Sequence, residues 1–247
     1  MVKRYFDNHA VGYNSAYQKK DNTRSFIFSE RKKLVLEMLD IGEGRVLDAG
    51  CGPGVYTDRL SEAGYEIYGV DASEGMIALA RAKHFKNAKF FVGSVDDLKF
   101  QDTFFDAILC IGVLEYLKDV EKAIKEAARV IRPGGIAIFT VPNAQSFLNT
   151  SNLLARNIVK SVCKLLKIKP PGSLLDYNYE LRLFSGKDLD LLLERNGFKI
   201  EKARFHIFRL PFLNKIFPEA SLYLMKKMNF VSSPFLGINY VVKCRRI

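Results

Sequence analysis

The chain has 247 residues, a hydrophobic fraction of 48% and a mean hydropathy of −0.03, which is the size and composition of one α/β domain with a substantial core. The formal net charge is +11: residues 1–143 hold 20 basic and 20 acidic side chains, whereas residues 144–247 hold 18 and 7. No apolar run approaches the ~20 residues that span a bilayer, and no signal peptide is visible at the N-terminus. The four cysteines lie far apart without metal-ligand spacing, so we expect free thiols, no metal site and a cytoplasmic location.

The first 29 residues are rich in Tyr, Asn and charge, and we expect them to form an irregular arm or lid. After Ser29 the apolar residues recur at helical spacing, which predicts a helix over 30–40. Strands and amphipathic helices then alternate, with strands predicted over 45–49, 66–70, 89–92, 105–111, 136–141, 198–203 and 238–245, and helices over 55–63, 74–84, 120–131 and 186–196. This alternation predicts a doubly wound, mostly parallel seven-stranded sheet with helices on both faces.

Two segments interrupt that alternation, and we expect both to be helical insertions that form a substrate cap on a single domain of residues 1–247. The first, 142–184, contains a basic amphipathic stretch near 146–168. Such a stretch is typical of a surface helix with solvated lysines, or of a lid or membrane-surface helix. The second, 204–237, holds six phenylalanines broken by prolines, so it either contributes to the core or walls a pocket for an apolar substrate.

The most informative motif follows the first predicted strand. An apolar run ends in Asp48, and glycines follow at alternate positions, Gly50, Gly52 and Gly54. Glycines are needed where a backbone turns sharply or lets a ligand approach closely. A nicotinamide or flavin dinucleotide fingerprint would have its third glycine where this chain has Val55. The spacing therefore argues against a dinucleotide fold.

A second apolar run ends in Asp71, seventeen residues after Gly54, where a carboxylate can accept both hydroxyls of a ribose. The glycine turn and the two aspartates together resemble the motifs of class I S-adenosylmethionine (SAM)-dependent methyltransferases, in particular the small-molecule branch of ubiquinone and menaquinone biosynthesis. The resemblance implies SAM as cofactor and S-adenosylhomocysteine (SAH) as product. It implies a cofactor site made of Tyr13, Arg31, Asp48, Gly50, Cys51, Gly52, Gly54, Asp71, Ala72, Met76, Ser94, Val95 and Cys110.

The resemblance also implies roles within this site. Asp48 acts on the methionine amino group through water, although its carboxylate could instead only tie down the turn. Asp71 could also be a helix cap, but Ser73 already serves that purpose. Ser94 stands where the family commonly has an aspartate that binds adenine, so its contact would be weaker. Many relatives carry a histidine near the position of Tyr116, and this chain does not, so a base role inferred from that histidine fails here.

The methyl acceptor is not identified by these motifs. We expect a small-molecule, lipid-linked or glycan-linked acceptor, acidic or lipid-like, whose hydroxyl would be deprotonated by His9 or His206. One alternative is an RNA methyltransferase, which the positive charge permits although no base-flipping motif follows 105–111. Another is a non-catalytic protein that keeps the fold and contacts an anionic membrane from the inner side.

Overall fold

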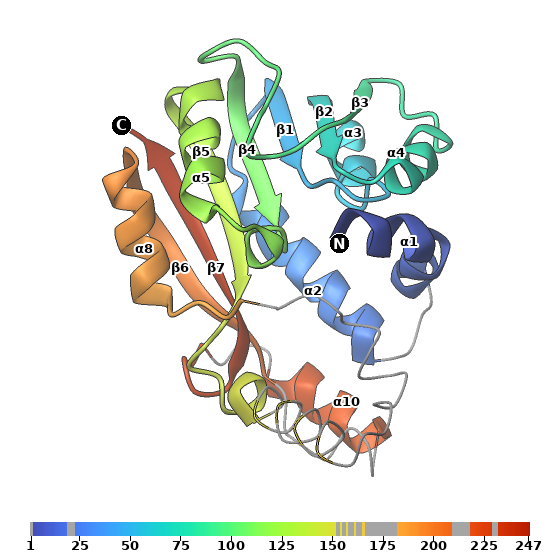
Figure 1. Cartoon of the computed structure of the whole chain (residues 1–247), viewed down its shortest axis with the longest axis vertical. Helices are drawn as coiled ribbons and strands as arrows, with labels where there is room; N and C mark the ends of the chain where they lie inside the picture. The colour runs from blue at the N-terminus through green and yellow to red at the C-terminus, as the bar shows by residue number, and fades with distance from the viewer. Residues whose placement is uncertain are drawn as a thin grey trace.

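The computed structural model describes residues 2–18, 23–151, 154, 157, 161, 165, 182–208, 218–228 and 232–247. Seven strands form one sheet in the order β3-β2-β1-β4-β5-β7-β6 (Figure 1). The strands are β1 (Arg45–Ala49), β2 (Glu66–Asp71), β3 (Ala88–Val92), β4 (Phe105–Ile111), β5 (Ile131–Pro142), β6 (Phe198–Phe208) and β7 (Gly237–Arg246). Only β7 runs antiparallel to its neighbours, and the predicted α/β class and mostly parallel sheet are therefore confirmed.

The helices within the described residues are α1 (Val2–Gln18), α2 (Thr23–Met38), α3 (Thr57–Glu62), α4 (Glu74–Arg81), the 3-10 turn η1 (Leu114–Tyr116), α5 (Val120–Val130), α8 (Gly186–Arg195) and α10 (Pro218–Met228). Three of them begin at a side-chain cap, and the cap predicted at Ser73 is among them. The side chains of Ser73, Asp119 and Ser185 each accept a backbone N–H in the first turn of α4, α5 and α8.

Alternate residues of each strand face opposite layers, and this period of two separates the core into two halves. On one side, Leu47 and Ile108 pack with apolar residues of α5 and α8. On the other side, Val46 and Leu109 pack with α2 and α3. Both faces of the central strands are buried, which explains why β1 and β4 are mostly apolar. Asp48 shares the parity of Val46, so its carboxylate lies on the α2 side of the sheet.

The prediction of an irregular arm over residues 1–29 is wrong, because most of this stretch forms α1 and the start of α2. Ser29 is not a helix cap either: it lies inside α2, and its hydroxyl donates to the Phe26 carbonyl. The signal for α1 is present in the sequence as Phe6, Ala10 and Tyr13, which recur at helical spacing.

Helix α1 lies against the start of α4 (Figure 1). Gly75 permits this approach, since a Cβ there would lie 3.3 Å from the Asp7 carbonyl oxygen and 3.4 Å from the Ala10 Cβ. The Asp7 carboxylate accepts hydrogen bonds from the Ser73 hydroxyl at 2.6 Å and from the Gly75 N–H at 3.3 Å. The N-terminal segment is therefore fixed over the ends of the strands, as a lid would be.

The predicted cap lies only partly within the described residues. Residues 147–151 are helical, and α10 follows β6 as a helical insertion should. Most of residues 152–181 and 209–217, which include Lys160 and Lys164, lie outside the described part of the chain. The interpretation of both insertions as one substrate cap stays a prediction.

Candidate active site

A cavity opens at the carboxyl ends of β1, β2 and β4, where ligands bind in open α/β sheets. Its walls come from the glycine turn after β1, the start of α4, the loop after β3 and the segment leading into η1, and α1 covers it. The lining residues are Lys3, Phe6, Tyr13, Gly50, Gly52, Asp71, Ala72, Ser73, Met76, Gly93, Ser94, Val95, Ile111, Gly112, Val113, Tyr116 and Leu117. Eight of the predicted cofactor residues are among them: Tyr13, Gly50, Gly52, Asp71, Ala72, Met76, Ser94 and Val95.

The Asp71 carboxylate links the two loops that form the floor of this cavity. One oxygen accepts the Gly52 N–H at 2.9 Å, and the other accepts the Ser73 N–H at 2.9 Å. Burial raises the pKa of Asp71, and the two N–H groups oppose that rise. A carboxylate offers about four lone-pair sites, so each oxygen keeps one for a hydroxyl of a bound ribose.

Asp48 is 1% exposed, and its Oδ2 has no hydrogen-bond partner among the described residues. Burial, and then repulsion from Asp71, raises the pKa of Asp48 to about 7. The turn is held by other groups, because the N–H groups of Gly50 and Cys51 both donate to the Val70 carbonyl. The interpretation of Asp48 as a tie for the turn therefore loses support. An ammonium group nearby would satisfy the buried carboxylate, as the methionine amine of SAM would.

The glycine turn leaves room for a ligand. Gly52 has φ +53° and nothing within 4 Å of the position that its Cβ would take. At Gly50, by contrast, a Cβ would lie 2.2 Å from the Val113 side chain. A side chain at either position would fill or distort the cavity, so the glycines present fit a ligand of the kind of SAM at this turn.

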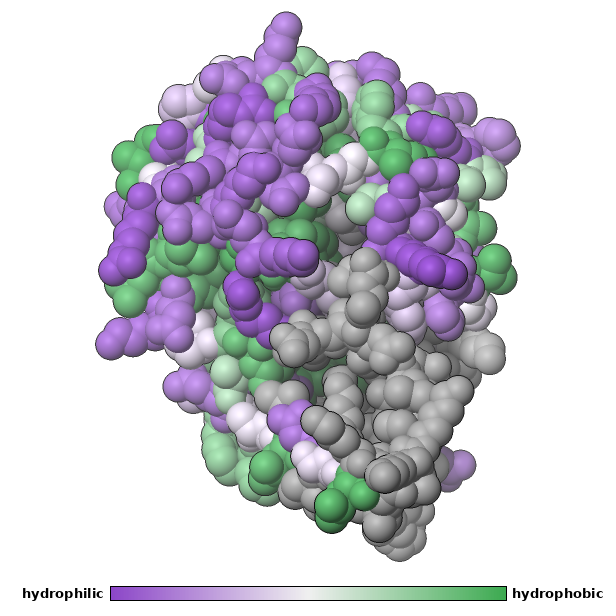
Figure 2. Space-filling model, viewed as in Figure 1, coloured by the Kyte–Doolittle hydropathy of each residue, from purple (hydrophilic) through white to green (hydrophobic). Residues whose placement is uncertain are grey.

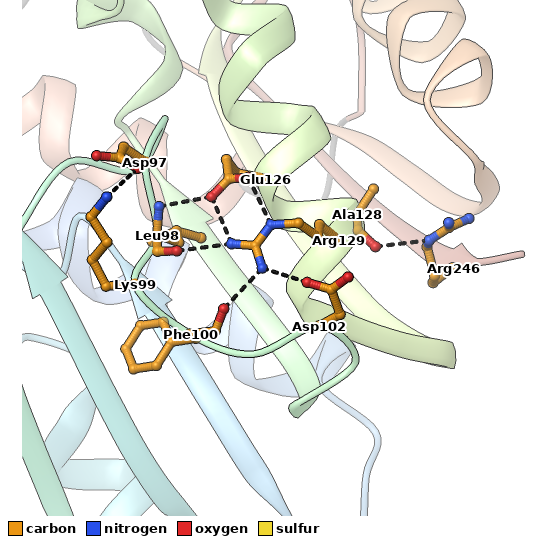
Figure 3. A network of polar contacts seen from close by, with 9 residues as sticks. All are labelled: Asp97, Leu98, Lys99, Phe100, Asp102, Glu126, Ala128, Arg129 and Arg246. Carbon is orange, nitrogen blue, oxygen red and sulfur yellow. Dashed lines mark hydrogen bonds and ion pairs between the residues drawn. The ribbon is translucent and has the colours of Figure 1, made fainter.

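The loop after β3 that carries Ser94 and Val95 is held by a network around Arg129 of α5 (Figure 3). The Arg129 guanidinium forms ion pairs with Glu126 and Asp102. It also donates to the carbonyls of Leu98 and Phe100, while Glu126 accepts the Leu98 N–H. The Ser94 hydroxyl donates to Asp96 in the same loop. Arg129 thus fixes the backbone that follows the predicted adenine contact.

Five other predicted cofactor residues do not line the cavity. Asp48, Cys51 and Cys110 are buried beside it, and burial raises the pKa of both thiols well above the usual range. Gly54 lines a separate pocket together with Lys32 and Lys83. Arg31 lies on α2, with its Nη1 3.4 Å from the position that a Cβ on Gly112 would take.

The two predicted bases are far from equivalent. His9 is an exposed residue of α1, where its ring stacks on Tyr5 and contacts the Tyr5 carbonyl. His206 is 6% exposed near the end of β6, and its Nε2 has no partner among the described residues. Burial is the main cause that lowers the pKa of His206 to about 4. Neither histidine lines the cavity, and a base role for either stays a prediction.

Glu115 was not predicted from the sequence. It belongs to η1, is 7% exposed, and its Oε2 has no partner among the described residues. Burial raises the pKa of Glu115 to about 7, and the backbone N–H of Glu115 and then attraction to Arg31 oppose that rise. Nothing in the local sequence signals this burial, which depends on the fold, because η1 packs on β5 and α5 and Arg31 of α2 lies close enough to act on the carboxylate.

The comparisons with known proteins agree with this geometry. Residues 47–139 match the methyltransferase domain family. A ubiquinone biosynthesis O-methyltransferase of Xanthomonas oryzae is 32% identical over 109 residues, which are 42% of this chain and 46% of that protein. The chain therefore spans about half the length of that relative. A ubiquinone biosynthesis O-methyltransferase of Rickettsia typhi is 25% identical over 219 residues, covering 84% of this chain and 83% of that protein.

Among solved structures, a SAM-dependent methyltransferase of Thermotoga maritima, described as a possible histamine N-methyltransferase, superposes with a TM-score of 0.68. The match covers 99% of both chains at 20% identity, so it supports the fold alone. Together with the family match, it confirms the predicted resemblance to class I SAM-dependent methyltransferases.

Two further observations concern only the described part of the chain. None of its helices is both long and apolar enough to span a bilayer. No group of three or more His, Cys, Asp or Glu residues there is arranged to hold a metal ion. The predictions about membrane, nucleic-acid and small-molecule partners stay predictions.

Proposed function

We propose that this chain, whose residues 47–139 match the methyltransferase domain family, transfers a methyl group from SAM to a hydroxyl of an apolar, phenol-like small molecule. The observation that carries the proposal is the cavity bounded by Asp71 and the glycine turn, with the buried and unsatisfied Asp48 carboxylate beside it. These groups match the ribose and the amine of one ligand.

SAM supplies a methyl group bound to a positively charged sulfur, so the leaving group is a neutral thioether and little further activation is needed. The protein contributes alignment and exclusion of water. In this chain Asp71 would hold the ribose and Asp48 the amine. The ring of Phe6 on α1 packs edge-on against Tyr116 of η1, with centroids 5.5 Å apart, and helps to close the cavity.

Support for an apolar acceptor comes from two exposed aromatic residues, one in each of the insertions 142–184 and 204–237. The rings of Phe147 and Phe235 lie 5.6 Å apart and are 47% and 58% exposed. Figure 2 shows hydrophilic residues over most of the upper part of this face, with apolar residues in its middle and at its lower end. Support for oxygen as the methylated atom comes from the two relatives, both of which are named ubiquinone biosynthesis O-methyltransferases.

The test is methyl transfer from SAM to 4-nonylcatechol, followed by mass spectrometry, with 4-nonylaniline as the matched amine and a short nucleic-acid duplex as the third substrate. A methyl ether of the catechol, with no methylated aniline or nucleic acid, supports the proposal. Methylation of the amine alone or of the nucleic acid alone would overturn it.

A further inference from the structure

We propose that Glu115, held beside Arg31 behind Gly112, is the group that accepts the proton of the acceptor hydroxyl during methyl transfer. The inference rests on the proposed function. It assigns the proton transfer to Glu115 in place of His9 or His206.

The position of Glu115 relative to the cavity carries the argument. Gly112 lines the cavity, and the position that its Cβ would take is 3.4 Å from Arg31 Nη1 and 3.6 Å from Glu115 Oε1. The missing side chain therefore leaves the two charged groups next to the backbone of the cavity wall. Gly112 is fixed there with φ +68°, and its N–H donates to the Thr140 hydroxyl at 2.9 Å.

The second argument is that Glu115 has capacity for a further hydrogen bond in a place from which water is largely excluded. Its Oε2 is buried and unpartnered among the described residues, although buried carboxylate oxygens normally have partners. A hydroxyl that approached this oxygen would supply the hydrogen bond. The carboxylate would then be within reach of the proton that it has to take.

The charged and titratable surroundings of Glu115 set its basicity. Arg31 on α2 favours the carboxylate, and burial disfavours it. The Cys110 thiol on β4 interacts with the same carboxylate and stays protonated, because burial raises the pKa of that thiol. The positive charges of Arg204 on β6 and of Arg31 both lower the pKa of His206. A base works best when its pKa is near the working pH, which favours Glu115, with its pKa of about 7, over His206, with its pKa of about 4.

The step balances without a further reactant. The acceptor oxygen forms a bond to the methyl carbon, the carbon–sulfur bond breaks, and its electron pair stays on sulfur. The hydroxyl proton moves to the Glu115 carboxylate. The products are a methyl ether, neutral SAH and a protonated Glu115, which later releases its proton to solvent.

The first test needs no acceptor. SAM carries a positive sulfonium charge that SAH lacks, whereas both ligands carry the amine that would meet Asp48. Calorimetric titration with SAM and with SAH at pH 7, in phosphate and in Tris, therefore measures the proton uptake that depends on the sulfonium charge. We expect the wild type to take up more protons with SAH than with SAM, by up to about half a proton for a group that titrates near the working pH.

Glu115→Gln should abolish this difference while SAH still binds within about threefold of the wild-type affinity, and His206→Gln should leave the difference in place. Retained SAH binding shows that the Gln variant is folded. If the difference survives in Glu115→Gln and disappears in His206→Gln, the proposal is wrong and His206 is the titrating group.

The second test uses 4-nonylcatechol. With wild-type protein, kcat should rise with pH up to about 7 and then level off, because the ionised carboxylate is the active form. Glu115→Gln should lower kcat about 100-fold and remove this pH dependence, with Glu115→Asp in between. The proposal is overturned if Glu115→Gln has an unchanged kcat. It is also overturned if this variant has a lower melting temperature and weaker SAH binding while its pH profile stays like that of the wild type. If the wild type methylates no hydroxyl, the proposed function fails, and the calorimetric result still decides whether Glu115 titrates with the cofactor charge.

Discussion

The carboxylate of Asp71 accepts the backbone N–H of Gly52 at 2.9 Å, so a single side chain at the end of β2 sets the shape of the glycine turn after β1. The second carboxylate oxygen of Asp71 accepts the Ser73 N–H at the start of α4. Three segments of the cavity floor therefore depend on one residue. Its loss would change both the contacts to a ligand and the turn on which that ligand lies.

Asp71→Ala should weaken SAH binding at least about 100-fold in isothermal titration. Two hydrogen bonds from ribose hydroxyls to a carboxylate would be lost, each contributing about 1.5–3 kcal/mol. Asp71→Asn should also weaken binding, because its amide nitrogen cannot accept the N–H that it would face. The exposed Asp188→Ala of α8 serves as the matched control and should bind as the wild type does. Equal affinities of Asp71→Ala and wild type would rule out the ribose role.

The contribution of Asp48 to the stability of the ligand-free protein should fall as pH rises from about 4 to 7. Its folded-state pKa of about 7 lies above the unfolded value of 3.8, so the folded state binds more protons over this interval. Asp48→Asn should flatten this pH dependence and raise the melting temperature at pH 8. Glu115, with its raised pKa, contributes in the same direction, so the informative quantity is the difference between the variant and the wild type.

SAH binding should respond to Asp48 in the opposite sense. Because the ligand ammonium favours the ionised carboxylate, SAH affinity should increase as pH rises toward 7, and Asp48→Asn should bind more weakly without this trend. Calorimetry at pH 5.5, 6.5 and 7.5 measures the SAH affinity of each protein and its change with pH. A pH trend that is the same in Asp48→Asn and wild type would assign the effect to another group.

The parts of the site that the sequence predicts are those with local causes. The turn after Asp48 needs glycines because of its backbone geometry, and Gly50, Gly52 and Gly54 all have positive φ. Ser73 and Asp119 cap helices from positions that sequence rules recognise. These features depend only on neighbouring residues, so they are visible without the fold.

The parts that the sequence does not predict depend on contacts between distant segments. The surroundings of Glu115 depend on β5 and α5, on which η1 packs, and on Arg31 of α2, about 80 positions earlier in the chain. The helix α1 was missed because its stretch is polar overall, and its position depends on Gly75 and Ser73 far along the chain. Tertiary packing decides the burial of Glu115 and the position of α1, whereas the helix α1 itself has a local signal in the spacing of Phe6, Ala10 and Tyr13.

Arg129→Met should lower the melting temperature by about 4–8 °C, because it leaves the Leu98 and Phe100 carbonyls and the Glu126 carboxylate without their partner. SAH affinity should fall as well, since the same loop carries Ser94 and Val95. Arg129→Lys keeps the charge but cannot reproduce the branched contacts, so it should recover only part of the stability. Thermal unfolding with and without SAH separates the two effects. A variant that loses stability but binds SAH normally would show that the loop does not contribute to binding.

Asp7→Ala should detach α1 from α4 and leave the sheet intact. The hydrogen bond from the Ser73 hydroxyl is the largest cause that lowers the pKa of Asp7. With the Gly75 N–H it forms the partly buried polar contact between these helices, which also share the exposed ion pair of Lys3 with Glu74. We expect faster amide hydrogen exchange in residues 2–18 and faster SAH dissociation, with a melting temperature close to that of the wild type. Glu74→Ala, which removes only the exposed ion pair with Lys3, is the matched control and should change neither rate. If Asp7→Ala exchanges and releases SAH at wild-type rates, apolar contacts such as Phe6 with Tyr116 hold α1 in place and the polar contact does not.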